Sequence, residues 1–275
     1  MTITKEERIY NAQKALRGTL LDGARKCSDP SLRNLTHELL LYLDCPQECW
    51  LRATGYLRDR LGVERVDGGY SSPADTQYQP GQAESVIDTE EIPSFAGVLV
   101  NNADNGVRRI WEANHPVVFK SLLEDRSFSV SLRRDLLRTG ASTKIAVALR
   151  DRTGPFGLIC ADRVKRGLPE WKSVQFDIFA DAASSVLGPI LGAAQRIGIE
   201  YSGEIDPAAL DSLTKAEARV AMLASQGLSY KEIARKTGRS VFTIDHHLRK
   251  IRRKLGIDSH AKLVRFLNQQ SFADE

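Results

Sequence analysis

The chain has 275 residues, 42% of them hydrophobic and 27% charged, and its formal net charge is +4. This composition predicts a folded protein rather than a disordered chain, and the length favours two domains. The four cysteines lack zinc-finger spacing, the N-terminus is charged, and no run approaches the roughly 18 apolar residues of a membrane helix, so we expect a cytoplasmic protein without a membrane segment.

The positive charge is concentrated in the last quarter of the chain. Residues 213–275 contain 13 Lys/Arg and 6 Asp/Glu, a net charge of +7, whereas the preceding residues have a net charge of −3. A localised positive field is typical of proteins that bind nucleic acids. A basic surface without a partner is the alternative that charge alone leaves open.

The first 61 residues have helical composition. We expect N-terminal helices within residues 1–44, in the runs TKEERIYNAQKALRGTLLDGARK and SLRNLTHELLLYL, and a further helix after Pro46. Cys45 and Cys49 lie one helical turn apart near the start of that helix, where a thiolate would be favoured. A redox switch is one interpretation of this pair, and two small, partly buried side chains are the other.

Strands and one long helix are predicted next. VERVDGGYSS reads as a strand, and KIAVALRDRTGPFGLICADRV reads as a hairpin with its turn at residues 150–155. A long helix should run from about Pro169 to Ile197, with a bend at Pro189. Once it has covered the sheet, one apolar stripe should remain, and we expect that stripe to pair with a second copy in a homodimer.

Two runs within residues 45–197, HPVVFKSLLEDRSF and KIAVALRDRTGPFGLICAD, resemble a GAF domain. The resemblance implies a six-stranded, largely antiparallel sheet with flanking helices and a pocket for a small molecule or a partner. The cysteine and histidine arrangement that attaches a bilin is absent, as is the pattern of cyclic-nucleotide GAF domains, so we expect no cofactor. The resemblance places the candidate ligand-binding residues at Tyr70, Trp111, Asn114, His115 and Cys160, although an ordinary core or loop role is the alternative for each.

Residues 198–212, GIEYSGEIDPAALDS, are expected to form a linker because of their Gly, Pro and acidic content. Capping chemistry then predicts four short helices in residues 213–275. The expected N-caps are Thr214, Ser229, Ser240 and Ser259, and the expected ends are Gly227, Gly238, Gly256 and about Gln269.

The third of these helices is amphipathic. Ile244, Leu248, Ile251 and Leu255 follow the spacing i, i+4, i+7, i+11 and form one apolar stripe. The basic side chains fall on the opposite face, beside Phe242. A helix that packs on two others and projects a basic face is typical of helix-turn-helix DNA readers, and a solvated charged face is the alternative.

The run from Leu213 to Val264 resembles a LuxR-type helix-turn-helix domain through LT..E, G.S.KEIA and S..TI..HL..I..KLG. The resemblance implies double-stranded DNA as the partner, with the third helix in the major groove. It places Ser229, Lys231 and Thr243 at the phosphate backbone, Asp245 and Arg249 at base edges, and His247 at the core edge. The complete set of expected DNA contacts is Ser229, Lys231, Ser240, Thr243, Asp245, His246, Arg249, Lys250 and Arg253.

Asp245 departs from the family, which usually has a basic residue at that position. A carboxylate cannot pair with phosphate, but it can accept a hydrogen bond from the cytosine amino group, or form an ion pair with Arg249 at i+4 and orient it. We prefer the ion pair. Both interpretations predict an altered sequence preference without loss of DNA binding.

We therefore expect an α+β multidomain protein with a GAF-like antiparallel sheet and flanking helices, a long connecting helix, and a C-terminal four-helix LuxR-type domain. No phosphate-binding Gly loop, metal-ligand cluster or nucleophile elbow is evident, so we expect no catalytic site and no metal. The strand–helix alternation of a response-regulator receiver is missing. A GAF-like domain that serves only dimerisation or protein interaction, and an acyl-homoserine-lactone sensor, are the alternative functions; the clustered Trp, Tyr and Asp pattern of the latter is not evident.

Overall fold

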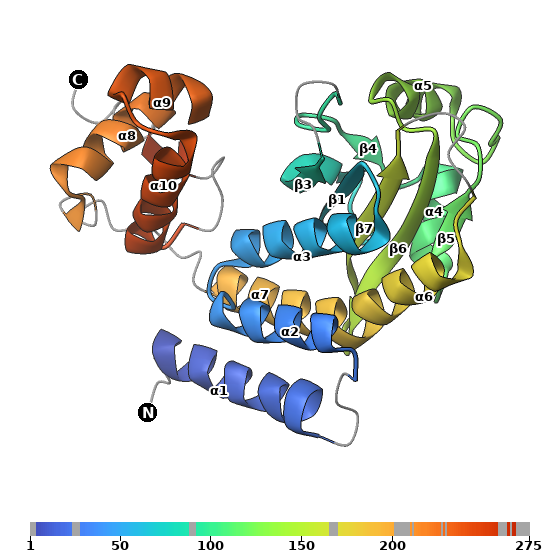
Figure 1. Cartoon of the computed structure of the whole chain (residues 1–275), viewed down its shortest axis with the longest axis horizontal. Coiled ribbons are helices and arrows are strands. Elements are labelled where there is room, and N and C mark those ends of the chain that lie inside the picture. The colour runs from blue at the N-terminus through green and yellow to red at the C-terminus, as the bar shows by residue number, and fades with distance from the viewer. Residues whose placement is uncertain are drawn as a thin grey trace. The chain divides into compact units, whose positions relative to one another are not determined.

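The computed structural model of the chain consists of two compact units, Met1–Gln195 and Arg196–Glu275 (Figure 1). The structure describes residues 4–23, 28–87, 92–164, 170–200, 210, 212–226, 228, 230–257, 263–264 and 266–267. For residues 5, 199 and 200 it describes the backbone alone. The two units are described separately below, as the N-terminal unit and the C-terminal unit.

Three helices open the N-terminal unit, as the sequence predicts. Helix α1 (Lys5–Arg17) begins at a capping box between Thr4 and Glu7 and continues into a π-helical turn, η1 (Gly18–Asp22). Helix α2 (Pro30–Leu41) is capped by Asp29, and α3 (Pro46–Leu61) ends at Gly62, whose φ of 62° places it in the left-handed region.

The core of the unit is a five-stranded antiparallel sheet with the order β3-β1-β7-β6-β5. A separate pair, β2 with β4, and a short 3₁₀ helix, η2 (Pro80–Gln82), lie between β1 and α4 in the chain. The GAF-like expectation of an antiparallel sheet with flanking helices is confirmed, but among the described residues the main sheet has five strands rather than six, because β2 and β4 pair with each other. The strands are β1 (Arg65–Tyr70), β2 (Gln77–Tyr78), β3 (Ala83–Val86), β4 (Val100–Asn101), β5 (Val117–Phe119), β6 (Thr143–Asp151) and β7 (Gly154–Arg163).

The two faces of the sheet pack against different helices. On one face, Ala146, Ala148 and Cys160 share an apolar cluster with side chains of α4 (Asn105–Glu112) and α5 (Val130–Arg138). On the other face, β1 and β7 pack closely on α3: a Cβ added at Gly68 would lie 2.5 Å from the ring of Trp50. The alternation of side chains along each strand therefore separates an α4–α5 side from an α3 side.

The predicted long helix is present but is built differently from the expectation. It comprises α6 (Ser173–Asp181), a π-helical segment η3 (Ala182–Leu187) and α7 (Gly188–Glu200). The amide of Gly188 donates to the carbonyl of Ala183, five residues back, so the wider turn comes directly before Pro189, which has no amide proton to donate. The expected start at Pro169 lies outside the described residues.

The apolar stripe expected to remain on this helix for dimer pairing is not available. The apolar side chains used for that expectation are largely buried within the unit, and Val174, with 57% exposure, is the large apolar side chain most exposed on the described part of the helix. The expectation of an uncovered stripe is wrong because α2 and α3 also pack on this helix. The buried positions are Phe179, Val186, Leu187, Ile190, Leu191, Ala194 and Ile197.

The same helix, Ser173–Gly198, is long and apolar enough to span a membrane by length and composition. A count of consecutive apolar residues does not detect this helix, because Asp177, Asp181, Ser184 and Ser185 interrupt them. More than half of its most apolar window (56%) is buried inside the unit, and the Tyr70 hydroxyl donates to the carbonyl of Leu191 at 3.0 Å. Its apolar composition is thus explained by packing on the sheet.

A cluster of buried charges crosses the α4–α5 side of the sheet. Arg65 donates through Nε and Nη2 to Oδ2 of Asp162, at 3.1 and 2.8 Å, and Lys144 Nζ lies 2.7 Å from Oδ1 of the same carboxylate. Lys144 also donates to Oδ2 of Asp67 at 3.3 Å. Because Arg65 faces Asp162 across the β1–β7 pair and Lys144 faces it across the β6–β7 pair, strand register brings these groups together.

The C-terminal unit contains α8 (Lys215–Ser225), α9 (Tyr230–Thr237) and α10 (Val241–Leu255). The caps predicted at Thr214 and Ser240 are confirmed, and Gly238 and Gly256 both have a φ of 66°. Leu263, Phe266 and Leu267, from the region of the predicted fourth helix, belong to the core. The predicted helix limits Gly227, Ser229, Ser259 and Gln269 lie outside the described residues, as does most of the predicted linker.

Replacing Asp162 should destabilise the N-terminal unit strongly. Asp162→Ala leaves Arg65 and Lys144 as buried cations without their shared partner, which should lower the free energy of unfolding by about 3–5 kcal/mol. Urea unfolding followed by tryptophan fluorescence measures this, because Trp50, Trp111 and Trp171 all lie in this unit. The exposed Asp177→Ala should change it by less than about 0.5 kcal/mol, and equal effects of the two variants would contradict the role of the cluster.

Candidate nucleic-acid interface

Helix α10 is held by one apolar stripe. Ile244, Leu248, Ile251 and Leu255 are buried, at 0–4% exposure, in a core shared with α8 and α9. This is the stripe predicted from the sequence. Its burial determines which side of the helix faces away from the unit, because residues at 100° per position on the other side cannot reach the core.

The outward side of α10 is basic, apart from one carboxylate. His246, Lys250 and Arg253 are exposed, whereas Asp245 and Arg249 are half-buried. Nη2 of Arg249 donates to Oδ2 of Asp245, one turn earlier, and the two side chains form an ion pair. The structure therefore contains the i,i+4 ion pair between Asp245 and Arg249 that we preferred as the interpretation of Asp245.

The polar residues expected at the phosphate backbone lie around the start of α10. The Ser240 hydroxyl accepts from the amide of Thr243 at 3.0 Å and shares a hydrogen bond with the Thr243 hydroxyl at 2.8 Å. Lys231, near the start of α9, is exposed. Ser229 lies outside the described residues, so its expected phosphate contact stays a prediction.

Two further polar residues of α10, His247 and Arg252, have a structural role rather than a DNA-binding role. His247 is half-buried, as expected from the sequence, and its Nδ1 is buried without a hydrogen-bond partner among the described residues. Arg252 is only 5% exposed and hydrogen-bonds to Tyr230 of α9. The cationic side chains of α10 are thus divided, with Arg252 joining the helices and Arg253 facing out.

Sequence reasoning gave no binding role to the apolar tip, Val241 and Phe242, at the start of α10. Their side chains are 44% and 77% exposed. Phe242 lies on the side of the helix opposite the buried stripe, where the helical wheel places it with His246 and Arg249. The position of Phe242 on the helical wheel could have identified it as a DNA contact, but the sequence analysis considered only polar and charged side chains for that role.

An ion pair joins the last turn of α10 to the first turn of α8. Nζ of Lys254, in the last turn of α10, lies 2.6 Å from Oε2 of Glu217 and donates to the carbonyl of Ser212 at 2.9 Å. The same Glu217 oxygen accepts from the amide of Thr214 and completes the capping box of α8. The hydrogen bond from Lys254, followed by that from the Thr214 amide, lowers the pKa of Glu217 to about 2.

The residues proposed for the ligand site of the N-terminal unit do not come together. Cys160 and Trp111 share the apolar cluster on the α4–α5 side, but the Trp111 indole donates to Asn102 at 3.1 Å. Tyr70 lies on the α3 side, where it contacts Trp50 edge to face. Asn114 and His115 are exposed.

A cavity of about 30 Å³ does lie in that cluster, between the sheet and helices α4 and α5. Cys160 lines it, and so do two charged residues that sequence reasoning missed, Asp67 and Lys144. The alternation of side chains along the strands does not predict these two residues, because charged side chains are rare on a buried strand face.

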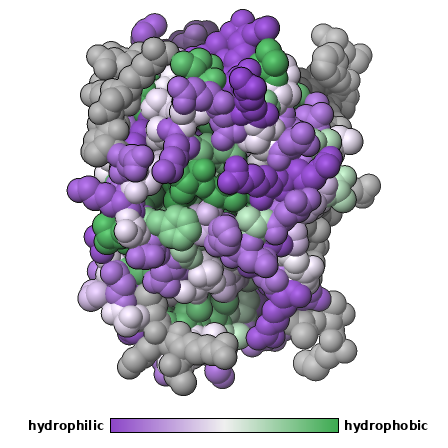
Figure 2. All heavy atoms as spheres, turned by 90° about the vertical axis from the view of Figure 1, so that its right-hand side faces the viewer, coloured by the Kyte–Doolittle hydropathy of each residue, from purple (hydrophilic) through white to green (hydrophobic). Residues whose placement is uncertain are grey.

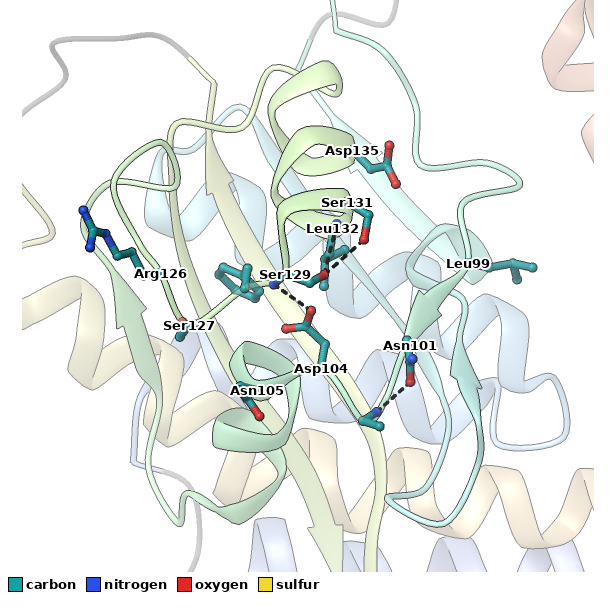
Figure 3. A pocket seen from close by; sticks show the side chains of 12 residues that line it. Leu99, Asn101, Asp104, Asn105, Arg126, Ser127, Ser129, Ser131, Leu132 and Asp135 are labelled. Carbon is teal, nitrogen blue, oxygen red and sulfur yellow. Dashed lines mark hydrogen bonds between the residues drawn. The ribbon is translucent and has the colours of Figure 1, made fainter.

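The outer surface near α5 has an open, mostly polar pocket (Figure 3). Asp104 occupies its centre: Oδ2 accepts from the amide of Ser129 at the start of α5, and Oδ1 accepts from the amide of Gly106. The carboxylate is thus used to cap two helices. Figure 2 shows apolar side chains on this face in separate patches between hydrophilic ones, with no continuous apolar surface.

Of the three cysteines that the structure describes, Cys49 and Cys160 are buried and Cys45 is half-buried. Burial raises the pKa of Cys49 well above its usual range, and its Sγ lies 3.1 Å from the carbonyl of Tyr42. Burial likewise raises the pKa of Cys160. Both are therefore neutral thiols at pH 7, which favours the structural interpretation of Cys45 and Cys49 over a reactive pair.

Comparison with known families identifies the C-terminal unit. Residues 211–267 match the family described as bacterial regulatory proteins, luxR family, so the chain carries a LuxR-type helix-turn-helix domain. No curated protein matches the chain.

The similar solved structures are GAF domains over the N-terminal part. The GAF domain of PixJ from Thermosynechococcus elongatus, in its blue-light absorbing form, is 17% identical, with 63% of this chain and 94% of that chain covered and a TM-score of 0.45. The GAF domain of a phosphoenolpyruvate-protein phosphotransferase from Acinetobacter is 12% identical, with 64% and 96% covered and a TM-score of 0.47.

The Glu217–Lys254 pair should make the C-terminal unit sensitive to acid. Because folding lowers the pKa of Glu217 from 4.5 to about 2, its contribution to stability is complete above pH 4.5 and is lost as the pH falls towards 2. Glu217→Gln should cost about 1–2 kcal/mol at pH 7 and flatten the dependence below pH 4.5.

Urea unfolding at each pH, followed by the methyl NMR signals of Ile244 and Ile251 in the full chain, measures this effect. Lys254→Met should reproduce the loss at pH 7, whereas Lys236→Met, at an exposed position of α9, should not. An acid dependence that remains unchanged in Glu217→Gln would contradict the assignment.

Proposed function

We propose that the protein is a dimeric cytoplasmic transcription regulator that reads double-stranded DNA through α10. In this proposal its GAF-like unit senses a small molecule or a partner and thereby controls the geometry of the two DNA-binding units. The observation that supports DNA reading most directly is the division of α10 into a buried apolar stripe and an outward basic side. We propose no enzymatic activity.

Helix α10 has the dimensions and polarity for the major groove. Its 15 residues span about 22 Å, and a helix of about 10–12 Å diameter fits a groove about 12 Å wide. The outward cations would neutralise phosphates and provide most of the non-specific affinity. Residues in the first turns, from Ser240 to Arg249, are the ones expected to reach base edges.

The ion pair on α10 suggests how base specificity arises. Asp245 accepts from Nη2 of Arg249 and holds the guanidinium on the outward side of α10, from which it would reach a base edge such as guanine O6 and N7. A partner one turn away restricts the Arg249 rotamers, so less conformational freedom is lost when the base is bound. The carboxylate also reduces attraction to phosphates and thus weakens non-specific binding.

On the α4–α5 side, the candidate site for the regulatory part of the proposal is the cavity lined in part by Asp67 and Lys144. An acyl-homoserine lactone is disfavoured because a cavity of about 30 Å³ is far below the roughly 300–1,000 Å³ of typical small-molecule sites. The same small volume favours the second candidate function, a unit that serves only dimerisation or protein interaction. Because most of the described apolar side chains of the long helix are buried, we propose that the dimer contact lies elsewhere.

DNA binding by the full chain tests the proposal. Sites selected from random duplexes should be bound with a strong salt dependence, and Arg249→Ala should lower the affinity for selected sites more than for random DNA. Arg133→Ala in the N-terminal unit is the control. Binding that is absent at low salt would refute the function, and genome-wide mapping with and without metabolites would test the sensing role.

Asp245→Lys should strengthen non-specific binding. The change adds a cation to the outward side of α10, so the slope of log K against log salt should become steeper by about one unit. Fluorescence anisotropy with random duplexes measures it, and Asp177→Lys controls for the same change in net charge. Identical slopes for the two variants would place Asp245 outside the groove.

Phe242 should contact a thymine methyl group. The apolar side chain at the tip of α10 is exposed in the absence of DNA and would lose contact with water in the groove. Replacing the contacted thymine by uracil, which lacks only the methyl group, should cost the wild type about 1 kcal/mol.

The matching variant is Phe242→Ala, which should lose affinity for the thymine site and become insensitive to uracil. Met222→Ala, at an exposed apolar position of α8, should keep the wild-type response. Equal sensitivity to uracil in the wild type and Phe242→Ala at every thymine of the site would refute the contact.

A further inference from the structure

Helix α9 has a basic side that the expected DNA contacts use only in part. Ile233 and Ala234 are buried and fix the rotation of the helix about its axis. Lys231 and Arg235, one turn apart, are both exposed and lie on the same side of α9. Lys231 is an expected phosphate contact, whereas Arg235 has no role so far. A surface that Lys231 faces is therefore also faced by Arg235.

A second unassigned cation, Arg239, lies in the turn between α9 and α10. Its amide donates to the carbonyl of Ala234 at 3.0 Å, and the amide of Gly238 donates to the carbonyl of Arg235 at 3.4 Å. With Gly238 at a φ of 66°, these two hydrogen bonds form a Schellman motif, which fixes the path of the chain after α9. The next residue, Ser240, caps α10. The backbone position of Arg239 is therefore set from both sides, and its side chain is exposed.

The folded unit does not neutralise these charges. Arg235 and Arg239 form no ion pair among the described residues, and the carboxylates of Asp245 and Glu217 already have cationic partners. Two cations at i and i+4, such as Lys231 and Arg235, repel each other and weaken a helix slightly. Exposed cations without acidic neighbours are the electrostatic footprint of a polyanion partner.

We propose that Arg235 and Arg239 bind phosphates of the DNA backbone beside the groove that α10 enters. Together with Lys231 they form a row of cations, the α9 row, which ends next to Ser240, itself an expected phosphate contact. The inference rests on the proposed DNA-binding function and adds two phosphate contacts to it. In a helix-turn-helix protein the helix before the recognition helix crosses the backbone, so the α9 row lies where phosphates are expected. An acidic protein surface is the alternative partner, and continuity with Ser240 favours DNA.

The α9 row holds the position of α10 on the duplex without reading bases. Phosphate contacts set the register and the orientation of a protein on DNA, but they carry no sequence information. Loss of such a contact lowers the affinity for selected and random sequences alike, whereas loss of Arg249 should lower it mainly at selected sites. This difference separates the α9 row from the base-reading residues of α10.

The salt dependence of DNA binding by the full chain tests the α9 row. Arg235→Ala and Arg239→Ala should each reduce the slope of log K against log salt by about one unit, and should lower the affinity at about 0.1 M salt by about threefold to tenfold. Selected and random duplexes should lose affinity by the same factor. Arg235→Lys keeps the charge and should keep the wild-type slope, which separates the charge of the side chain from its shape.

The matched control is Lys236→Ala. Lys236 is the residue next to Arg235, is equally exposed, and lies in the same last turn of α9, so both variants lose the same favourable interaction with the helix dipole. It is turned by about 100° around the helix from Arg235 and further from Lys231. Lys236→Ala should therefore change the salt slope much less than Arg235→Ala does.

Uncharged phosphates locate the contacts on the DNA. A methylphosphonate replaces one phosphate of a selected site, and each position of both strands is substituted in turn. The wild type should lose affinity at the phosphate that Arg235 contacts, and Arg235→Ala should be insensitive at that position while it remains sensitive at the others. Lys236→Ala should give the wild-type pattern. The methyl NMR signals of Ile244 and Ile251 report the fold of the C-terminal unit in each variant.

Two results would overturn the proposal: salt slopes of Arg235→Ala and Arg239→Ala that equal the slope of Lys236→Ala, or a methylphosphonate pattern that neither arginine variant changes. Either result would assign these cations to another partner, such as an acidic protein surface. A wild-type chain that binds no duplex at low salt would instead refute the proposed DNA-binding function itself.

Discussion

Burial of the apolar stripe on α10 is the constraint on which the DNA-binding interpretation depends. Four side chains, Ile244, Leu248, Ile251 and Leu255, fix the rotation of the helix about its axis. Every other side chain on α10 then has a determined position, either towards α8 and α9 or away from them. Arg252 and Arg253 are adjacent in sequence, yet one joins the helices and the other is available to a partner.

In the N-terminal unit, charge organises the core. Three adjacent strands, β1, β7 and β6, contribute Arg65, Asp162 and Lys144, and register places them side by side. Such a cluster is stable only while each charge has a partner, since removal of one partner leaves a buried charge. Asp67 is the exception, because Lys144 donates to its Oδ2 while its Oδ1 is buried without a hydrogen-bond partner among the described residues.

The two units illustrate different limits of inference from sequence. Thr214 and Ser240 were recognised as caps because capping depends on residues three positions apart. The spare stripe on Ser173–Gly198 was misjudged because its burial depends on α2 and α3, more than a hundred residues away in the chain. Asp67 and Lys144 were overlooked for the same reason, since only pairing across strands brings them to one cavity.

The sequence by itself determined local features of this protein: the N-terminal helices, the caps at Thr214 and Ser240, the hairpin of β6 and β7, the basic side of α10, and the Asp245–Arg249 spacing. These depend on interactions within a few residues, which periodicity and capping patterns describe. Only the tertiary structure decided which apolar faces are covered, that Tyr70 faces away from Cys160, and that Asp67 and Lys144 line one cavity. Those outcomes depend on contacts between segments distant in the chain, and no local pattern records them.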